Sequence, residues 1–228
     1  MHPEILFEDN HLLVINKPAG MLSQGDHTGD LCALDNCKHM IKLRDQKPGN
    51  VYLGLPHRLD RPTSGILVLA KTSKALTRLN KQFAEKSTQK IYWAMVTGAP
   101  KETPTRLQHY LVRKPAQNKS YAHKNEVPNS KMAELIYTKK QEFDRYSLVE
   151  IELLTGRHHQ IRSQLSAEGL TIKGDLKYGA KRPNNGGSIH LHARKLTLTH
   201  PTLKEPVTFT APPPKDALWN SIPAIETQ

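Results

Sequence analysis

The stretch His57-Arg58-Leu59-Asp60-Arg61-Pro62-Thr63-Ser64-Gly65 stands directly before the apolar run Ile66–Ala70. A second short apolar run, at 51–55, precedes it. These runs predict two strands, with Asp60 in the polar connection between them. A polar loop carried by rigid strands is a common position for functional residues.

Asp60 stands two residues after Arg58 and directly before Arg61. Neighbouring positive charge favours the ionised form of a carboxyl group, so we expect a carboxylate at neutral pH. A fixed carboxylate can act as a nucleophile or a base. The structural alternative is an aspartate that caps a turn and forms an ion pair with an arginine.

The surrounding pattern predicts further elements. We expect strands at 12–16, 90–97, 131–138, 146–154, 189–199 and 207–210, and helices near 30–43, at 73–86 with Ser73 as N-cap, and after 157. The Lys-, Asn- and Pro-rich region 99–129 is predicted to be the least ordered. Many strands and a few helices in irregular order predict the α+β class, with a large, mostly antiparallel or mixed β-sheet and a few packed helices. We expect one domain at 1–214 and a C-terminal tail at 215–228.

A second polar segment, Arg157–Arg162, stands at a predicted strand-to-helix junction. An inward-pointing Arg162 could hold a buried carboxylate with a bidentate fork. Gln160 and the preceding histidines would lie near backbone N–H groups that suit phosphate. The adjacent histidines also raise the alternative of a metal site, but no acidic residue stands close by in a metalloprotease pattern, so we predict no metal.

Tyr92, in the predicted strand at 90–97, has two interpretations. The ring can pack in the core, which is the more common role of an aromatic residue in a strand. If it faces a cleft, it offers a platform on which an unpaired base can stack.

The composition favours a polyanionic partner. Thirty-three Lys and Arg against 21 Asp and Glu give a net charge of +12 in 228 residues. Such a surplus attracts nucleic acid, although an ordinary basic protein would have the same composition. No signal peptide, membrane span or basic amphipathic helix is visible, so we expect no membrane partner. With only Cys32 and Cys37, a cytoplasmic location is expected.

Several segments together resemble the RluA-type pseudouridine synthases. The resemblance covers residues 4 to 214 and rests on Glu8-Asp9, Asn16–Gly20, His57–Lys71, Lys90–Tyr92, Leu154–Arg157, His159–Arg162, Gly174-Asp175, Tyr178-Gly179, Leu191–Ala193 and His200-Pro201. It implies a fold with a central basic cleft, and isomerisation of uridine to pseudouridine in ribosomal or transfer RNA without a cofactor.

The resemblance also implies roles for individual residues. Asp60 matches the essential aspartate, Tyr92 the aromatic residue that packs on the target base, and Arg162 the arginine paired with the aspartate. Arg58 resembles the side chain that fills the gap left by the flipped uridine. The remaining residues expected to bind RNA are His57, Arg61, Arg157, His159 and Gln160.

Two departures from the family pattern, Pro62 and His158, stand beside site residues and bear on substrate preference. We also expect a monomer that recognises RNA without a separate RNA-binding module. Two rival functions remain open. A non-catalytic RNA-binding or ribosome-assembly protein would have no need of Asp60, Tyr92 and Arg162 together. A metal-dependent nuclease would need a cluster of acidic ligands and would lose activity with chelator.

Overall fold

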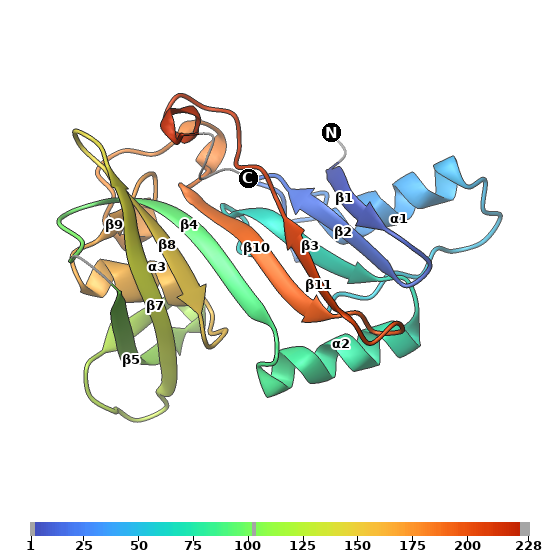
Figure 1. Cartoon of the computed structure of the whole chain (residues 1–228), viewed down its shortest axis with the longest axis horizontal. Helices are drawn as coiled ribbons and strands as arrows, with labels where there is room; N and C mark the ends of the chain where they lie inside the picture. Colours follow the sequence, from blue (N-terminus) through green and yellow to red (C-terminus); the bar gives the residue numbers. More distant parts are fainter. Residues whose placement is uncertain (1–2, 102–103, 224–228) are drawn as a thin grey trace. The chain divides into compact units, whose positions relative to one another are not determined.

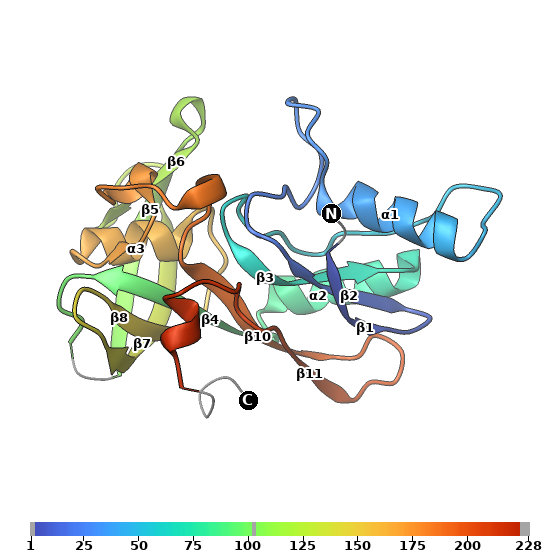
Figure 2. The same ribbon diagram turned by 90° about the horizontal axis from the view of Figure 1, so that it is seen from above.

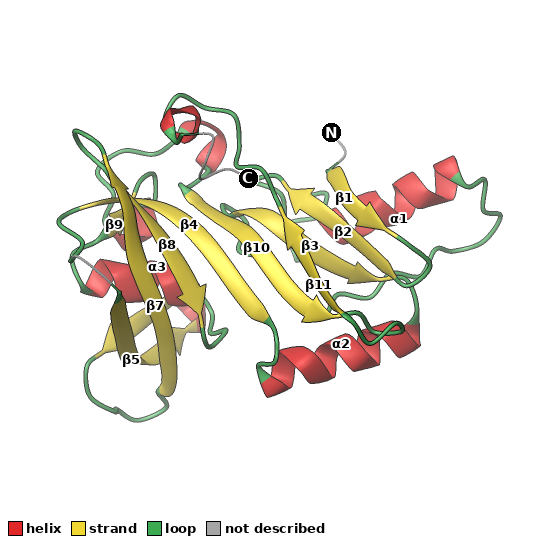
Figure 3. Cartoon of the chain, in the orientation of Figure 1, coloured by secondary structure: helices red, strands yellow, loops and turns green. Residues whose placement is uncertain are grey.

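The computed structural model describes residues 3–101 and 104–223. Within these ranges lie eleven strands and three α-helices, coloured by type in Figure 3. The α+β class predicted from the sequence is therefore confirmed. The chain divides into two compact units, the first formed by Met1–Thr88 with Ala193–Gln228 and the second by Gln89–His192. The single domain at 1–214 and the tail at 215–228 remain predictions, although Trp219 and Ile222, beyond the proposed boundary, are buried.

The first unit is built on a strand order in which β1, β2, β3 and β10 are neighbours and β11 pairs with β10. The strands are β1 (Glu4–Glu8), β2 (Leu12–Lys17), β3 (Ser64–Ala70), β10 (Leu191–Thr199, in this unit from Ala193 onward) and β11 (Pro206–Thr210). The pairs β1–β2, β2–β3 and β10–β11 are antiparallel.

Helix α2 (Ser73–Glu85) covers one face of this sheet, and Figure 1 shows it beside β3. Its Ala75 and Leu79 belong to a core cluster with alternate residues of β2 and β3, such as Val14 and Val68. Burying a valine or leucine side chain stabilises the fold by roughly 1.5–3 kcal/mol. The intervening residues are also buried, among them Leu13, Ile15, Leu67 and Leu69. Since alternate residues of a strand point to opposite faces, both faces of β2 and β3 are covered.

Gly65, at the start of β3, is required by a close approach of two backbones. Its φ is +113°, in the region that favours glycine. A Cβ atom at this position would lie 2.6 Å from the backbone nitrogen of Ala193 in β10. The glycine that follows the Asp60 segment thus allows β3 and β10 to lie side by side.

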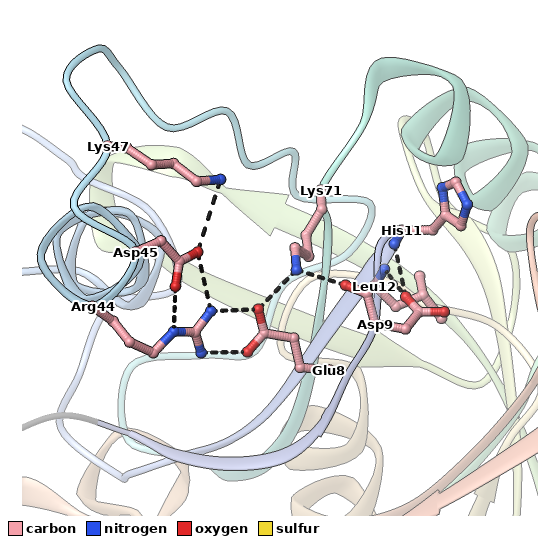
Figure 4. A network of polar contacts seen from close by, with 8 residues as sticks. All are labelled: Glu8, Asp9, His11, Leu12, Arg44, Asp45, Lys47 and Lys71. Atoms are coloured by element: carbon pink, nitrogen blue, oxygen red, sulfur yellow. Dashed lines mark hydrogen bonds and ion pairs between the residues drawn. The ribbon is translucent and has the colours of Figure 1, made fainter.

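Glu8 connects three segments of the first unit through an ion-pair network (Figure 4). Its carboxylate accepts two hydrogen bonds from Arg44, at 2.6 and 2.8 Å, and one from Lys71 Nζ at 2.7 Å. The hydrogen bonds from Arg44 lower the pKa of Glu8 to about 2. Arg44 ends helix α1 (Ala33–Arg44), so the network fixes that end of α1 to β1 and to the residue after β3.

The second unit contains the antiparallel order β4-β8-β7-β5-β6, with β9 paired to β4. The strands are β4 (Gln89–Thr97), β5 (Thr105–Lys114), β6 (Lys119–His123), β7 (Lys131–Glu142), β8 (Ser147–Leu153) and β9 (Thr171–Ile172). Helix α3 (Gln160–Ala167) packs against β5 and β6. Its fully buried Gln164 donates from Nε2 to the carbonyls of Leu107 and Ala133, at 3.3 and 3.2 Å.

Most predicted elements are confirmed within one to four residues, and three details of the prediction were wrong. The region 99–129 holds β5 and β6 instead of being the least ordered part of the chain. The N-cap of α2 is Thr72, whose hydroxyl accepts the N–H of Ala75, rather than Ser73. The run at 51–55 forms only an isolated bridge between Gly54 and Ala70.

Candidate active site

The segment of residues 57–63, called the Asp60 loop below, is held by hydrogen bonds on both sides of Asp60. The buried hydroxyl of Ser23 donates to the carbonyl of Leu59 at 2.8 Å and accepts its N–H at 3.0 Å. After Asp60, the N–H of Thr63 donates to the Asp60 carbonyl at 3.0 Å. The backbone that carries the partly buried Asp60 is therefore fixed by the fold of the first unit.

The turn after β2 packs against the same loop. The N–H of Gly20 donates to the Arg61 carbonyl at 2.8 Å, and Nε of Arg61 donates back to the Gly20 carbonyl at 3.0 Å. This reciprocal pair joins two residues that are 41 positions apart in the sequence. The contact gives a structural reason why the Asn16–Gly20 and Asp60 segments both belong to the family pattern.

Lys17 is fully buried beneath this contact, with 0% of its surface exposed. Its ammonium group donates to the carbonyls of Met21 at 2.7 Å, Pro18 at 3.0 Å and Arg61 at 3.4 Å. Burial lowers the pKa of Lys17 to about 7, while the negative charge of Asp60 opposes this shift. The lysine therefore lies within electrostatic range of Asp60. Sequence reasoning assigned no role to Lys17, because lysines are rarely buried.

The three cationic or aromatic neighbours of Asp60 have different surroundings. His57 Nε2 accepts the N–H of Val68 at 3.0 Å, and its ring stacks on Phe83 of α2 with centroids 4.7 Å apart. Arg61 forms an ion pair with Asp30 at 2.8 Å, and both side chains are about half exposed. Arg58 is exposed. The roles of all three in RNA binding remain predictions.

In the second unit, Arg162 of α3 forms a bidentate ion pair with Asp175. The Nε–Oδ2 and Nη2–Oδ1 distances are 2.6 and 2.8 Å, and the two side chains are 5% and 1% exposed. The guanidinium also lies 5.0 Å from the ring centre of Tyr178. The Gly174-Asp175 motif was noted in the sequence without a role, and Asp175 now has one as a partner of Arg162. The predicted pairing of Arg162 with Asp60 remains a prediction.

His159 and Gln160 are buried at the start of α3. His159 Nδ1 lies 3.0 Å from the Tyr178 hydroxyl, and its backbone has a φ of +52°. Burial, together with the charge of Arg162, lowers the pKa of His159 to about 2, so its ring is neutral at physiological pH. Gln160 accepts from the Thr155 hydroxyl at 2.7 Å and donates to the Glu134 carbonyl at 3.0 Å. These contacts are internal ones that shape the start of the helix.

Arg157 and Tyr92 complete the predicted set. Arg157 is exposed, and its Nε donates to the Met132 carbonyl at 3.2 Å. Tyr92 lies in β4 opposite Ile151, with 9% of its surface exposed. Most of its ring is therefore packed, and its contact with a target base remains a prediction.

The described ranges, 3–101 and 104–223, contain no group of three or more His, Cys, Asp or Glu side chains that could hold a metal ion. The buried His190 has its Nδ1 2.8 Å from Asn184 Nδ2. Cys32 and Cys37 are buried free thiols. No helix in the described part of the chain is long and apolar enough to cross a membrane.

Comparison with known proteins identifies the family that has this fold and this aspartate loop. The sequence profile described as RNA pseudouridylate synthase matches residues 11–167. The chain belongs to this family, and its predicted resemblance to the RluA type is confirmed.

Individual relatives agree with this family. The chain is 36% identical to a ribosomal large subunit pseudouridine synthase C of Vibrio vulnificus, over 91% of this chain and 65% of the relative. It is 34% identical to a tRNA pseudouridine synthase C of Salmonella typhimurium, over 91% of this chain and 84% of the relative. The chain spans about two thirds of the length of several curated relatives, including the Vibrio protein at 65%.

Two solved structures are similar over nearly the whole chain. Human RNA Pseudouridylate Synthase Domain Containing 4 aligns with a TM-score of 0.78 and 26% identity, covering 93% of this chain and 89% of that one. Human RNA Pseudouridylate Synthase Domain Containing 1 aligns with a TM-score of 0.73 and 27% identity, covering 93% and 84%.

Proposed function

We propose that this chain isomerises uridine to pseudouridine in ribosomal or transfer RNA, with Asp60 as the catalytic carboxylate. The observation that carries the proposal is the position of Asp60. It lies in a loop whose backbone is fixed by Ser23 and Gly20, within the region that matches the pseudouridylate synthase family. The names of the relatives, which include ribosomal and transfer RNA synthases, support RNA as the substrate.

The reaction rearranges one nucleotide and requires no cofactor. The N1–C1′ glycosidic bond of uridine breaks, the base turns in place, and a C5–C1′ bond forms. The hydrogen on C5 leaves to water and N1 gains a proton, so the product is an isomer of the substrate. A stacked base must first be extruded, which costs a few kcal/mol and is easiest in a single-stranded loop.

Arg162 and Tyr92 have proposed roles around Asp60. The Asp175 carboxylate holds Nε and Nη2 of Arg162, and this pair fixes the direction of the whole guanidinium. The family resemblance assigns Arg162 as the partner of Asp60, and we propose that in this role the arginine orients the carboxylate. Tyr92 supplies a flat surface for the extruded uracil. Arg58 is assigned to the gap that the base leaves in the RNA.

The experiment that tests the function uses transcripts of ribosomal and transfer RNA labelled with tritium at C5 of uridine. We expect the wild type to release tritium to water with and without chelator, and the Asp60→Asn variant to release none. Asp144→Asn, at an exposed turn residue between β7 and β8, is the matched control and should behave as the wild type.

Other outcomes would change the assignment. Tritium release that survives in Asp60→Asn would remove Asp60 from the mechanism. Loss of wild-type activity with chelator would favour the metal-dependent alternative. Binding that is sensitive to salt, without release from any RNA, would favour the non-catalytic RNA-binding protein. We further propose a cytoplasmic monomer, and light scattering coupled to size exclusion tests the oligomeric state.

A further inference from the structure

Four cations gather where the β5–β6 hairpin turns. Arg113 and Lys114 end β5, Lys119 begins β6, and Lys177 lies in the 3₁₀ turn Leu176–Tyr178. Nζ of Lys177 donates to the Asn118 carbonyl at 2.9 Å, so this turn packs against the hairpin. Lys114 and Lys119 stand directly opposite each other in the strand register. Like charges in directly opposite positions destabilise a strand pair, so this arrangement lowers the stability of the β5–β6 hairpin.

These four cations form no ion pair with any acidic side chain in residues 3–101 and 104–223. Other lysines on the surface do have acidic partners. Lys81, for example, lies 3.7 Å from Glu85 on α2. Because no acidic side chain in the described residues compensates the repulsion at the hairpin, a polyanion is the partner that fits it.

An aromatic ring lies between two of the cations. The Nζ atoms of Lys114 and Lys119 are each 5.2 Å from the ring centre of the half-buried Tyr121. The Tyr121 hydroxyl donates to Gln117 Oε1 at 2.7 Å, which fixes the ring. A flat ring flanked by cations is the combination used to bind single-stranded nucleic acid, since bases stack on the ring and phosphates contact the cations.

The hairpin is joined to the start of α3 by short hydrogen bonds. The Tyr178 hydroxyl accepts the N–H of Ser120 at 2.9 Å and donates to its carbonyl at 3.1 Å. Ser120 Oγ lies 2.9 Å from His158 Nδ1, and His158 Nε2 lies 3.1 Å from Asn118 Oδ1. His158, a departure from the family pattern, is therefore one of the residues that position the hairpin. Figure 2 shows β5 and β6 beside α3.

We infer that Lys114, Lys119, Tyr121 and Lys177 form a basic hairpin surface that binds the sugar–phosphate backbone of the substrate RNA. The cations contact phosphates, and Tyr121 stacks on an unpaired base outside the target uridine. This inference rests on the proposed function, because it takes RNA as the substrate. It adds a second contact that positions the RNA without touching the reacting base.

The test compares two triple variants with equal loss of charge. The first is Lys114→Gln with Lys119→Gln and Lys177→Gln. The control is Lys42→Gln with Lys74→Gln and Lys81→Gln, at exposed positions of α1 and α2. Binding to the labelled transcripts is measured from about 50 to 200 mM salt, a range over which phosphate contacts make the affinity fall steeply. Each lost phosphate contact on single-stranded RNA lowers the slope of log K against log salt by about 0.7, so the hairpin variant should lose about 2.

The control variant should keep a slope closer to that of the wild type. Equal slopes for the two triple variants would overturn the inference. RNA binding would then depend on the net charge of the protein and not on the position of the lysines. Tyr121→Leu should weaken binding about tenfold or more without changing the slope, since stacking carries no counterion release. Thermal unfolding of each variant confirms that the fold is intact.

Tritium release separates this inference from the proposed function. If the wild type releases tritium, the hairpin variant should lose kcat/KM mainly through a higher KM, whereas the control should lose little. If the wild type releases none, the proposed function fails, and the salt slopes still decide whether the hairpin binds RNA.

Discussion

The Asp60 loop and the start of α3 contain similar residues and use them differently. In the loop, the backbone is held by groups from outside it, namely Ser23 and Gly20, and the side chains of Arg58 and Arg61 are exposed. At the start of α3, the side chains of His159, Gln160 and Arg162 are themselves buried and make the internal contacts. The loop therefore presents groups to solvent, whereas α3 supports its surroundings. A substitution at the start of α3 should therefore lower stability and activity together. A substitution of an exposed residue in the loop should lower activity with little change in stability.

The largest effect is expected when the buried ion pair of α3 is broken. Asp175→Ala leaves the Arg162 guanidinium buried without this partner, which should lower the free energy of unfolding by about 3–5 kcal/mol. The control is Asp30→Ala, which removes the half-exposed partner of Arg61 and should cost less than about 1 kcal/mol. Urea unfolding measures both values. Similar losses for the two variants would contradict the contrast between the regions.

Lys17 should make stability depend on pH beneath the Asp60 loop. Its pKa is about 7 in the folded protein, against an ordinary value of 10.5. Between these values the unfolded chain binds more protons, so stability rises as pH rises and is lost as pH falls towards 7. Relative to Lys17→Met, the wild type should gain about 2 kcal/mol between pH 7 and pH 9. Unfolding free energies that change in parallel for the two proteins would show that Lys17 does not titrate in this range.

Ser23→Ala tests the hydrogen bonds that fix the loop before Asp60. Loss of both bonds to Leu59 should cost about 1–3 kcal/mol in unfolding free energy, because the groups are buried. Tritium release should fall more than RNA affinity, since the change loosens the backbone of Asp60. Ser221→Ala, at an exposed serine, is the control. An intact turnover number in a destabilised Ser23→Ala protein would mean that these bonds only support the fold.

The smallest effect on stability is expected for Arg58→Gln. The side chain is exposed, so the free energy of unfolding should change by less than about 0.5 kcal/mol. RNA turnover should nevertheless fall, because Arg58 is assigned to the gap left by the target base. Denaturation and tritium release on the same preparation check both values. A stability loss as large as that of Ser23→Ala would place Arg58 among the supporting residues instead.

The sequence predicted those parts of the fold whose pattern is local. The strands β3 and β8 were found because apolar runs and strict alternation mark them, and the position of Asp60 followed from the Pro and Gly around it. The strand β5 was missed although Leu107, His109 and Leu111 are buried in alternation. The polar His109 at a buried position conceals that pattern.

Contacts between distant segments could not be predicted in this way. Asp175 is thirteen residues from Arg162 in the sequence, and nothing local pairs the two. The burial of Lys17 contradicts the usual preference of lysine for the surface, and it follows only from the carbonyl groups that converge on its ammonium group. Similarly, His159 and Gln160 read as surface groups near phosphate until the fold shows them turned inward.

The division of the chain also sets an order for folding during synthesis. The second unit is one continuous stretch, whereas the first needs β10 and β11, which are translated after it. Since domains fold as they emerge, the second unit can be complete while β3 still lacks its neighbour β10. During that interval β3 is an open edge, of the kind that pairs with other chains. The interval ends only when β10 has left the ribosome and pairs with β3.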